Sequence, residues 1–311
     1  MDHLGELTTI ADRLRCSDLT EGVRTDHPLG RLTTYRVGGS AALFVRPADL
    51  GELSRVAEAV SAVAVPVLVV GRGSNLLVAD TGFEGLAIQL GPGFEEVGVV
   101  GTRLTAGGAA SLPTVARLSV AEGLAGFEWA VGVPGSIGGA VRMNAGGHGS
   151  EMSEVVEAVT LVDLTDGDRR TVPVGELDLG YRRSSVADTQ VVASVTLRLD
   201  GGARSDGEEL LAEIVRWRRE NQPGGQNAGS VFTNPPGDSA GRLIELAGGK
   251  GLRIGSAVVS ERHANFIQAD SGGSAIDVLL VMTEVQRLVA EAHGIELTPE
   301  TVLVGFNGGR G

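Results

Sequence analysis

Cysteine and aromatic residues are scarce in this 311-residue sequence. The single cysteine, Cys16, excludes an intramolecular disulfide. The opening segment also lacks the basic and then apolar pattern of a signal peptide, so we expect a cytoplasmic protein. Because aromatic residues make up only 4% of the chain, Val, Leu, Ala and Ile must supply most of the core contacts.

Long apolar runs and basic clusters are also missing. The longest apolar run, residues 62–70, contains Pro66 and is far shorter than the roughly 20 residues that span a bilayer. The formal net charge is −13 and Lys and Arg form no long run, which argues against nucleic acid or an anionic membrane surface as a partner. The five histidines show no HExxH spacing, so no metal site is expected.

The length and the 42% hydrophobic content allow two or perhaps three domains with sizeable cores. Helical patterns cover residues 49–61, 113–122 and 274–293, and strand-like patterns cover 66–70, 97–100, 104–106, 159–162, 191–199 and 296–305. The segment GGARSDG at 201–207 breaks the pattern before a strongly helical stretch, and we expect a domain boundary there.

Glycine, in contrast, is concentrated in two loops. Residues 123–149 contain nine glycines in 27 positions, and a second loop, GRGSN at 71–75, follows a valine-rich strand. Such density suits backbone that adopts φ > 0 or lies against a ligand. The loops lack the third glycine of a GxGxxG fingerprint, since Leu76 stands there, and the lysine of a P-loop. Each loop alone could be a structural turn, but the two together favour one long ligand, and a dinucleotide such as FAD fits that length.

Polar side chains in two other motifs are candidates for substrate chemistry. Arg182 and Arg183 are neighbours on a segment that we expect to be extended, so only one of them can face a cleft. That arginine could clamp a carboxylate or phosphate, whereas the alternative is a solvated pair. Ser230 follows the flexible QPGGQNA segment and could donate a proton if a neighbour positions it; the alternative is a turn or cap serine.

Seven motifs, in this order, resemble those of the UDP-N-acetylenolpyruvoylglucosamine reductase family over about residues 25–308. They are TTYRVGG, GRGSNLL, GFEWAVGVPGSIGGAVRMNAGGHG, YRRSS, AGSVFTNP, AGRLIELAGGKGLRIGSAVVSERHANFI and LTPETVLVG. The resemblance implies an α+β FAD-binding fold of the vanillyl-alcohol oxidase type with a separate C-terminal α+β substrate domain. Residues 20–90 and 91–202 would form two FAD-binding subdomains, residues 206–302 would form the substrate-binding domain, and residues 303–311 could fold back onto the first subdomain.

The resemblance also implies a reaction and its partners. In this family NADPH reduces FAD, and the reduced flavin then reduces the enolpyruvyl ether of UDP-N-acetylglucosamine to UDP-N-acetylmuramate in peptidoglycan precursor synthesis. One rival interpretation is another flavoenzyme of the same fold that oxidises a hydroxy acid or a sugar lactone and therefore offers a base for an alcohol. A second rival is a nucleotide-sugar binding protein without activity.

The family motifs imply a role for individual residues of this chain. Ser230 resembles the proton donor to C2 of the substrate, and Arg182 and Glu300 resemble the polar pair at the substrate carboxylate that stabilises the enol. Asn234 and Lys250 resemble substrate-binding positions. The implied cofactor-binding residues are Arg36, Gly71, Gly73, Ser74, Asn75, Leu76, Gly132, Pro134, Gly135, Ser136, Gly138, Gly139 and Asn144.

The chain departs from the family pattern at one position, and the length of one of its loops resembles that of a particular subgroup. Thr233 stands where the family usually has a lysine, so an anionic contact made there is missing or is supplied by Arg216, Arg218 or Arg219. No tyrosine occurs between the YRRSS and AGSVF motifs. The sequence therefore resembles the shorter subgroup that lacks a tyrosine-bearing loop.

Overall fold

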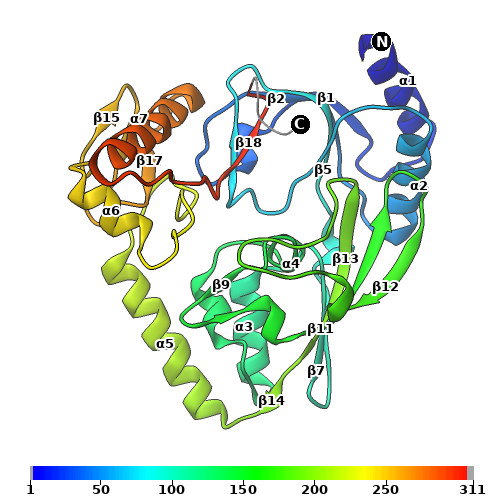
Figure 1. Cartoon of the computed structure of the whole chain (residues 1–311). Helices are drawn as coiled ribbons and strands as arrows, with labels where there is room; N and C mark the ends of the chain where they lie inside the picture. Colours follow the sequence, from blue (N-terminus) through cyan, green and yellow to red (C-terminus); the bar gives the residue numbers. More distant parts are fainter. Residues whose placement is uncertain (1–2, 307–311) are drawn as a thin grey trace. The chain divides into compact units, whose positions relative to one another are not determined.

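The computed structural model describes residues 3–306 (Figure 1). The chain folds into two compact units. Unit 1 contains Met1–Thr25, Ala42–Arg72 and Gly85–Arg218. Unit 2 contains Asp26–Ala41, Gly73–Glu84 and Arg219–Gly311. The units are therefore interleaved along the sequence, and each is described separately below.

A five-stranded antiparallel sheet with the order β12-β11-β13-β7-β6 forms the centre of unit 1. Its strands are β6 (Val97–Val100), β7 (Arg103–Gly107), β11 (Val156–Asp163), β12 (Arg169–Pro173) and β13 (Gln190–Arg198). The register pairs Val159 with Val195 and Val195 with Ala106, and all three are fully buried. Because alternate residues of a strand face the same side, these positions build one face of the core.

Two helices that carry or precede the glycine run pack into that core. They are α3 (Leu112–Ala121) and α4 (Ile137–Arg142), and both contribute buried residues to the same hydrophobic cluster as the sheet. Backbone bonds also join α4 to the end of β7, because the amide of Gly138 donates to the carbonyl of Gly108 at 2.9 Å. The sheet thereby fixes the position of the glycine-rich segment.

A second hydrophobic cluster of unit 1 lies under α1 (His3–Arg15) and α2 (Leu50–Ser61). The four-stranded sheet β1-β2-β5-β3 is made of β1 (Val23–Pro28), β2 (Ser40–Val45), β3 (Val67–Val69) and β5 (Phe83–Ile88). Strands β3 and β5 pair in parallel, with Val67 opposite Leu86. Strands β1, β2 and β5 carry the chain from one unit into the other.

Unit 2 is built on a small antiparallel sheet, β15-β16-β17, covered by a long helix (Figure 1). Its elements are β4 (Leu76–Val78), α6 (Ala240–Leu246), β15 (Arg253–Ile254), β16 (Ala257–Val259), β17 (Ile267–Ala269), α7 (Ala275–His293) and β18 (Val302–Val304). Ser274 caps α7 by accepting from the amide of Asp277, and Asp80 accepts from the amides of Ala275 and Ile276 at 2.9 and 3.0 Å. The segment 73–84 is thereby anchored to the long helix.

Several short elements and one helix of 18 residues complete the described part of the chain. They are η1 (Gly30–Leu32), η2 (Pro92–Phe94), β8 (Leu124–Ala125), η3 (Glu128–Gly132), β9 (Gly146–Gly147), β10 (Ser150–Glu151), η4 (Met152–Glu154), η5 (Val174–Glu176), β14 (Asp200–Gly201) and α5 (Arg204–Asn221).

The helices predicted at 49–61, 113–122 and 274–293 are confirmed as α2, α3 and α7, and the interior strands are confirmed within a few residues. Two expectations need correction. Helix α5 begins at Arg204, inside the predicted break, because the carbonyl of Ala203 accepts from the amide of Gly207 and starts the helix. The tail predicted as a strand over 296–305 is extended in a ladder only at Val302–Val304, since Pro299 makes an isolated bridge instead.

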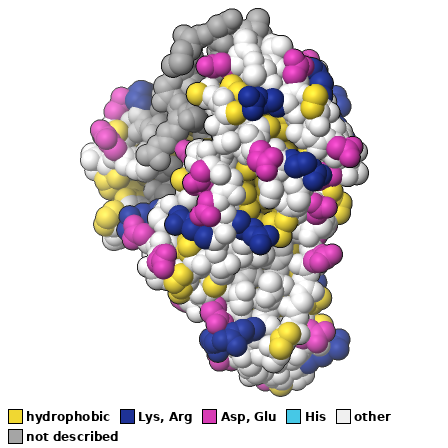
Figure 2. Space-filling model, turned by 90° about the vertical axis from the view of Figure 1, so that its right-hand side faces the viewer, with side chains coloured by type: hydrophobic (Ala, Val, Ile, Leu, Met, Phe, Trp, Pro, Cys, Tyr) yellow, Lys and Arg dark blue, Asp and Glu magenta, His cyan; other side chains and the backbone are white. Residues whose placement is uncertain are grey.

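Acidic and basic side chains are interspersed on the face of the molecule shown in Figure 2. Many of them form exposed ion pairs, such as Arg103 with Glu157 at 2.8 Å, which contribute little to stability. Within residues 3–306 no helix has the length and apolar character needed to cross a membrane.

Glu52 is the buried carboxylate on which the start of α2 depends. Its Oε1 accepts from the amide of Thr20 at 2.9 Å and from that residue's hydroxyl at 2.5 Å, and its Oε2 accepts from the amide of Ala48 at 2.8 Å. Burial alone would raise the pKa of Glu52, but these hydrogen bonds and the nearby Arg55 outweigh it and lower the pKa.

We predict that Glu52→Gln lowers the free energy of unfolding by about 1–3 kcal/mol at neutral pH, the range for hydrogen bonds to a charged acceptor. A carboxyl whose pKa is lower in the folded state stabilises the fold above its unfolded pKa and loses this effect as the pH falls through the folded pKa. The difference between the two proteins should therefore shrink under acid conditions. Urea unfolding followed by circular dichroism measures it, and Glu58→Gln, exposed on the same helix, should leave the midpoint unchanged.

Candidate functional site

In unit 2, Ser230 and Glu300 lie on adjacent segments although they are far apart in the sequence. The amide of Glu300 donates to the carbonyl of Val231 at 2.7 Å, and a bridge pairs Phe232 with Pro299. The residue that follows Ser230 is therefore bonded to the backbone of Glu300. The predicted proton donor and the predicted acidic residue share one local framework.

The first glycine loop joins the same framework. The side-chain Nδ2 of Asn75 donates to the carbonyl of Glu300 at 3.0 Å, and the carbonyl of Asn75 accepts from the amide of Val302 at 2.9 Å. From there β18 continues in parallel with β4, with Val302 opposite Leu76. Unit 2 thus brings together the predicted loop residues Gly73, Ser74, Asn75 and Leu76 with Ser230 and Glu300.

The TTYRVGG motif lies against this loop. The amide of Thr34 donates to the carbonyl of Gly73 at 3.0 Å. Arg36 follows in the left-handed region, with φ of +54°, held by a bond from its amide to the hydroxyl of Thr33 at 3.1 Å. Its side chain is exposed, as a residue that meets an anionic ligand at a surface must be.

Glycine is required at two positions of the 71–75 loop for steric reasons. Gly73 has φ of +62°, and a Cβ there would lie 2.2 Å from the carbonyl oxygen of Leu32. In unit 1, a Cβ at Gly71 would lie 2.5 Å from Oγ of Ser136. Gly71, which belongs to unit 1, thus lies directly against Ser136 of the second glycine loop.

Within the second glycine loop, Ser136 caps α4. Its hydroxyl accepts from the amide of Gly139 at 3.3 Å, while the amides of Ile137 and Gly138 donate to the carbonyls of Ala110 and Gly108, each at 2.9 Å. The amides at the start of α4 are therefore used within the protein. If Gly138 and Gly139 contact a cofactor, they do so through Cα and carbonyl atoms rather than through N–H groups.

Asn144, at the end of the glycine run, is a fully buried hub in unit 1. Its Nδ2 donates to Oε1 of Glu151 at 2.9 Å and to the carbonyl of Gly180 at 3.1 Å, and its Oδ1 accepts from the amide of Ser153 at 2.9 Å. Its own carbonyl accepts from Nη1 of Arg182 at 3.4 Å. All the amide groups of Asn144, a predicted cofactor-binding residue, are therefore bonded to other residues of the protein.

The segment carrying Arg182 is a turn, and our expectation of an extended segment there is wrong. The amides of Gly180 and Arg183 donate to each other's carbonyls at 3.0 and 3.1 Å, and Arg182 between them has φ of +55°. Asn144 also bonds to the first residue of the turn, through its Nδ2 and the carbonyl of Gly180. As expected, the two arginines differ in direction: Arg183 is exposed beside Asp178, whereas Arg182 is half-buried and also donates to the carbonyl of Gly146 at 3.4 Å.

The two predicted substrate-binding residues both bond to their own unit. Oδ1 of Asn234 accepts from the amide of Ala240 at 3.0 Å, at the start of α6. Nζ of Lys250 pairs with Glu245 at 2.8 Å. A substrate that recruits Lys250 must compete with this carboxylate.

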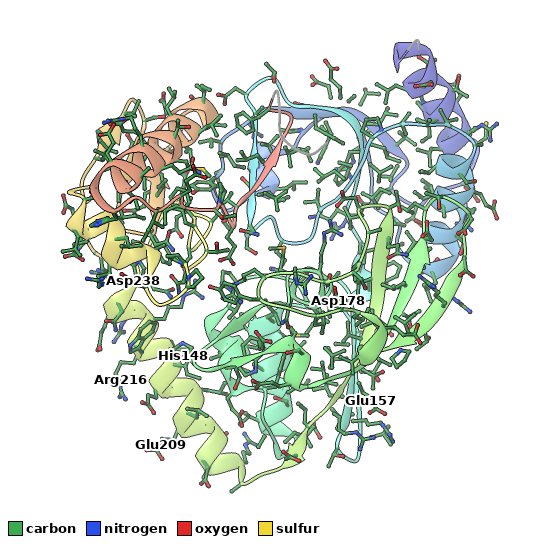
Figure 3. All side chains as sticks on the ribbon, in the orientation of Figure 1. His148, Glu157, Asp178, Glu209, Arg216 and Asp238 are labelled. Carbon is green, nitrogen blue, oxygen red and sulfur yellow. The ribbon has the colours of Figure 1, made fainter. Side chains whose placement is uncertain are left out.

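The hydroxyl of Thr233, where the family usually has lysine, donates to the carbonyl of Thr298 at 3.3 Å. Among the three arginines considered as replacements, Arg216 points outward from α5 and Arg219 is exposed (Figure 3). Arg218 is half-buried, donates to the carbonyl of Gly132, and has its pKa lowered by burial.

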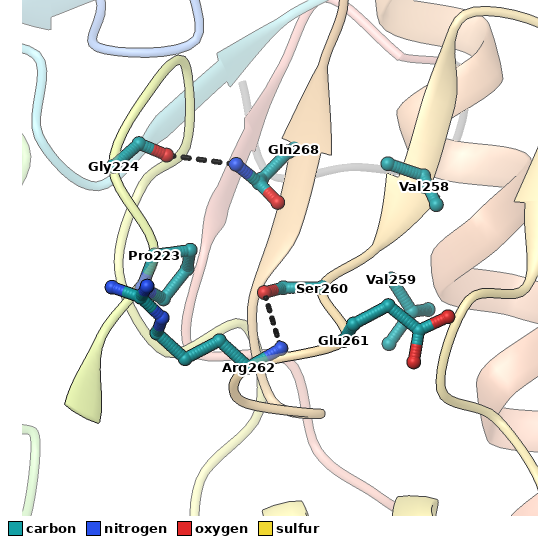
Figure 4. A pocket seen from close by; sticks show the side chains of 8 residues that line it. All are labelled: Pro223, Gly224, Val258, Val259, Ser260, Glu261, Arg262 and Gln268. Atoms are coloured by element: carbon teal, nitrogen blue, oxygen red, sulfur yellow. Dashed lines mark hydrogen bonds between the residues drawn. The ribbon is translucent and has the colours of Figure 1, made fainter. Parts of the chain in front are cut away.

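A hollow of about 370 Å³ in unit 2 lies elsewhere (Figure 4). Gln268 bonds across it to the carbonyl of Gly224 at 2.8 Å, and the amide of Arg262 donates to Oγ of Ser260 at 3.2 Å. None of the predicted site residues lines this hollow, so we do not assign the reaction to it. Among the described residues no group of three or more His, Cys, Asp or Glu side chains is arranged to hold a metal ion.

Sequence reasoning missed Glu151. Its carboxylate accepts from Oγ of Ser153 at 2.6 Å as well as from Asn144. The signal was weak, because one acidic residue just beyond the glycine run has no distinctive spacing. Only the folded hairpin of β9 and β10, which pairs Glu151 with Gly146, reveals its connection to Arg182.

Comparisons with known proteins show the family of this chain. A family model described as FAD binding domain matches residues 41–172, and one described as UDP-N-acetylenolpyruvoylglucosamine reductase, C-terminal domain, matches residues 221–304. The reductase of that name from Heliobacterium modesticaldum is 45% identical over 91% of each chain. UDP-N-acetylenolpyruvoylglucosamine reductase 2 of Symbiobacterium thermophilum is 40% identical over 97% of this chain and 98% of its own.

A solved structure leads to the same family. The crystal structure of UDP-N-acetylenolpyruvylglucosamine reductase from Thermus caldophilus matches with a TM-score of 0.80 and 35% identity, over 91% of this chain and 99% of that one. The fold and the matched domain define an FAD-dependent oxidoreductase with the predicted α+β FAD-binding fold. The chain belongs to the UDP-N-acetylenolpyruvoylglucosamine reductase family.

We predict that Gly73→Ala destabilises the first glycine loop by more than about 1–2 kcal/mol, because a left-handed alanine is strained and its Cβ meets a backbone oxygen. Purified protein should then retain less FAD, measured as the ratio of flavin to protein absorbance. Gly98→Ala, at an open position on strand β6, is the matched control. Equal flavin content in both variants would contradict the steric requirement.

Proposed function

We propose that this protein catalyses the NADPH-dependent reduction of UDP-N-acetylglucosamine enolpyruvate to UDP-N-acetylmuramate, in cytoplasmic peptidoglycan precursor synthesis. The observation that carries the proposal is the backbone bond that joins Glu300 to the residue after Ser230. It supports a proton donor and a carboxylate acting on the same substrate group. Relatives of this name that match over at least nine-tenths of the chain support the choice of substrate.

The glycine loops fit a flat, anionic cofactor. At Gly73 a side chain would meet the backbone of Leu32, and at Gly71 it would meet the hydroxyl of Ser136, so glycine keeps both positions compact. We assign FAD binding to residues of these loops and of the TTYRVGG motif. From the motif and the first loop they are Arg36, Gly71, Gly73, Ser74, Asn75 and Leu76. From the second loop they are Gly132, Pro134, Gly135, Ser136, Gly138, Gly139 and Asn144. When bound, FAD supplies the hydride that NADPH has delivered to it.

The protein's own residues then handle the charge and the proton. Hydride addition at C3 of the enolpyruvyl group leaves negative charge at C2 and the neighbouring carboxylate. Arg182 stabilises this charge, and Glu300 completes the polar pair at the carboxylate. Ser230 donates a proton to C2, which a hydroxyl can do only from close range. Asn234 and Lys250 bind the rest of the substrate, Lys250 after release from Glu245.

Oxidation of a hydroxy acid or a sugar lactone by the same fold is not favoured. Such a reaction needs a base placed for an alcohol. The predicted residues Ser230, Glu300 and Arg182 instead suit the protonation of an enolate, because a hydroxyl can donate a proton and an arginine can stabilise negative charge. The similar proteins that match most of the chain carry the reductase name. An inactive binding protein would have no need for all three polar residues.

We predict that the purified protein is yellow, that NADPH bleaches it under anaerobic conditions, and that the enolpyruvyl nucleotide restores the colour. The bleaching reports hydride transfer to the flavin, and the return reports transfer to the substrate. Flavin absorbance in a stopped-flow instrument measures both steps. A hydroxy acid added to the oxidised protein is the control and should bleach nothing. Protein that takes up FAD but keeps its reduced spectrum with the nucleotide would overturn the proposal.

We predict that Ser230→Ala leaves reduction by NADPH unchanged and slows reoxidation by the nucleotide about 100-fold or more, the usual contribution of a placed acid or base. Ser271→Ala, an exposed serine in the same unit, is the control for the purification and should behave as wild type. Equal reoxidation rates in wild type and Ser230→Ala would remove Ser230 from the mechanism.

A further inference from the structure

Arg182 is placed in an unusual way for a side chain that must meet a substrate. It sits in a four-residue turn in the left-handed region, which costs conformational energy for any residue but glycine. Its guanidinium donates to the carbonyls of Asn144 and Gly146, both at 3.4 Å, which is long for a charged donor. The guanidinium also lies over the ring of Tyr181, 5.1 Å from its centroid. A nearby negative charge would add to these contacts and orient the arginine further.

Glu151 is a negatively charged group in reach of this arginine. Its backbone pairs with Gly146 across β9 and β10, so it lies on the hairpin that supplies one of the acceptors of Arg182. Its carboxylate is half-buried and fixed by Oγ of Ser153 at 2.6 Å and Nδ2 of Asn144 at 2.9 Å. A carboxylate with two donors on one oxygen has a defined direction.

Asn144 connects this carboxylate to the arginine by covalent and hydrogen bonds. One hydrogen of its amide goes to Glu151 and the other to the carbonyl of Gly180, the residue that opens the turn of Arg182. Its own backbone carbonyl accepts from Arg182. Because the Asn144 side chain is fully buried and all its amide groups are bonded, it links the position of Glu151 to that of the turn.

The charge of Glu151 points to the same connection. The hydroxyl of Ser153 lowers the pKa of Glu151 most, burial acts in the opposite direction, and the amide of Asn144 and the positive charge of Arg182 lower it further. Glu151 is therefore an anion at neutral pH. Arg182 is close enough for mutual attraction, so the anion favours one position of the guanidinium.

We propose that Glu151 is a positioning residue that holds Arg182, through Asn144 and the β9–β10 hairpin, in the orientation that receives the substrate carboxylate. The inference rests on the proposed function, because it assigns Arg182 to the substrate. Glu151 itself touches no reacting atom in this scheme. Its effect is to preorganise an arginine that would otherwise have several rotamers.

A double-mutant cycle tests the proposal on the full-length, FAD-loaded protein. Glu151→Gln keeps the shape and an oxygen acceptor but removes the charge, and Arg182→Gln removes the group acted upon. We expect Glu151→Gln to slow reoxidation by the enolpyruvyl nucleotide about 10- to 100-fold, as loss of an orienting partner does at other sites. Reduction by NADPH should keep its wild-type rate.

The decisive comparison is the effect of Glu151→Gln when Arg182 is already Gln. If Glu151 acts through Arg182, adding Glu151→Gln should then change the reoxidation rate less than 2-fold, because the two effects are not additive. An equal loss in both backgrounds would overturn the proposal and leave Glu151 a structural residue. Glu154→Gln, exposed three residues further on, should match wild type throughout.

The experiment separates this inference from the proposed function. If wild-type protein, once reduced by NADPH, is not reoxidised by the nucleotide, the proposed function fails and the cycle has no signal. If wild type is reoxidised and Glu151→Gln is reoxidised equally fast with unchanged flavin content, only the role of Glu151 fails. A variant that loses FAD would show a structural defect, and Glu151→Asp, which keeps the charge, should then restore flavin and reoxidation together if the charge is what matters.

Discussion

A single side-chain hydrogen bond, from Nδ2 of Asn75 to the carbonyl of Glu300, joins segments that are 225 residues apart in the chain. The parallel pairing of β18 with β4 begins immediately beyond it, and the loop of Ser230 is joined to the same strand through Val231. Closing so long a loop costs entropy that only a set of mutually supporting bonds can offset. The predicted residues Asn75, Ser230 and Glu300 of unit 2 therefore lie on segments that long-range backbone contacts hold together, whereas Asn234 and Lys250 bond to residues close by in the sequence.

In unit 1, a buried polar side chain joins segments that are distant in the sequence. Asn144 has two amide donors and one carbonyl acceptor, and each of them has a partner: Glu151 and Ser153 lie on one segment and Gly180 lies on another. A buried amide left half-satisfied would be costly, which makes the arrangement all-or-none. Asn144 consequently links the turn of Arg182 to the hairpin of Glu151. Ser184 strengthens it, since its hydroxyl donates to the carbonyl of Arg142 at 2.7 Å.

The fold was predictable wherever a local pattern decides the structure. Periodicity located α2 and α7 because burial of one helix face requires it, and Ser274 was recognisable as a cap from its spacing to Asp277. The turn at Arg182 was not predicted, since two arginines in a row carry no turn signal and one of its contacts, from Asn144 to the carbonyl of Gly180, comes from a residue 36 positions earlier. For the same reason the interleaving of the two units escaped the sequence. It follows from long-range strand pairing, which leaves no mark on composition.

The glycine run of residues 123–149 acquires a second purpose from these contacts. Its density suggested a surface for a ligand, yet the amides of Gly138 and Gly139 are bonded inside unit 1, and a Cβ at Gly146 would lie 2.5 Å from the carbonyl oxygen of Ser150. Glycine is needed at Gly146 so that the hairpin can close and hold Glu151 near Arg182. Part of the run is therefore required by the protein's own packing, since the backbones of Gly146 and Ser150 approach too closely to leave room for a side chain. In the proposed scheme the same close approach keeps Glu151 on the hairpin whose Gly146 carbonyl accepts from Arg182.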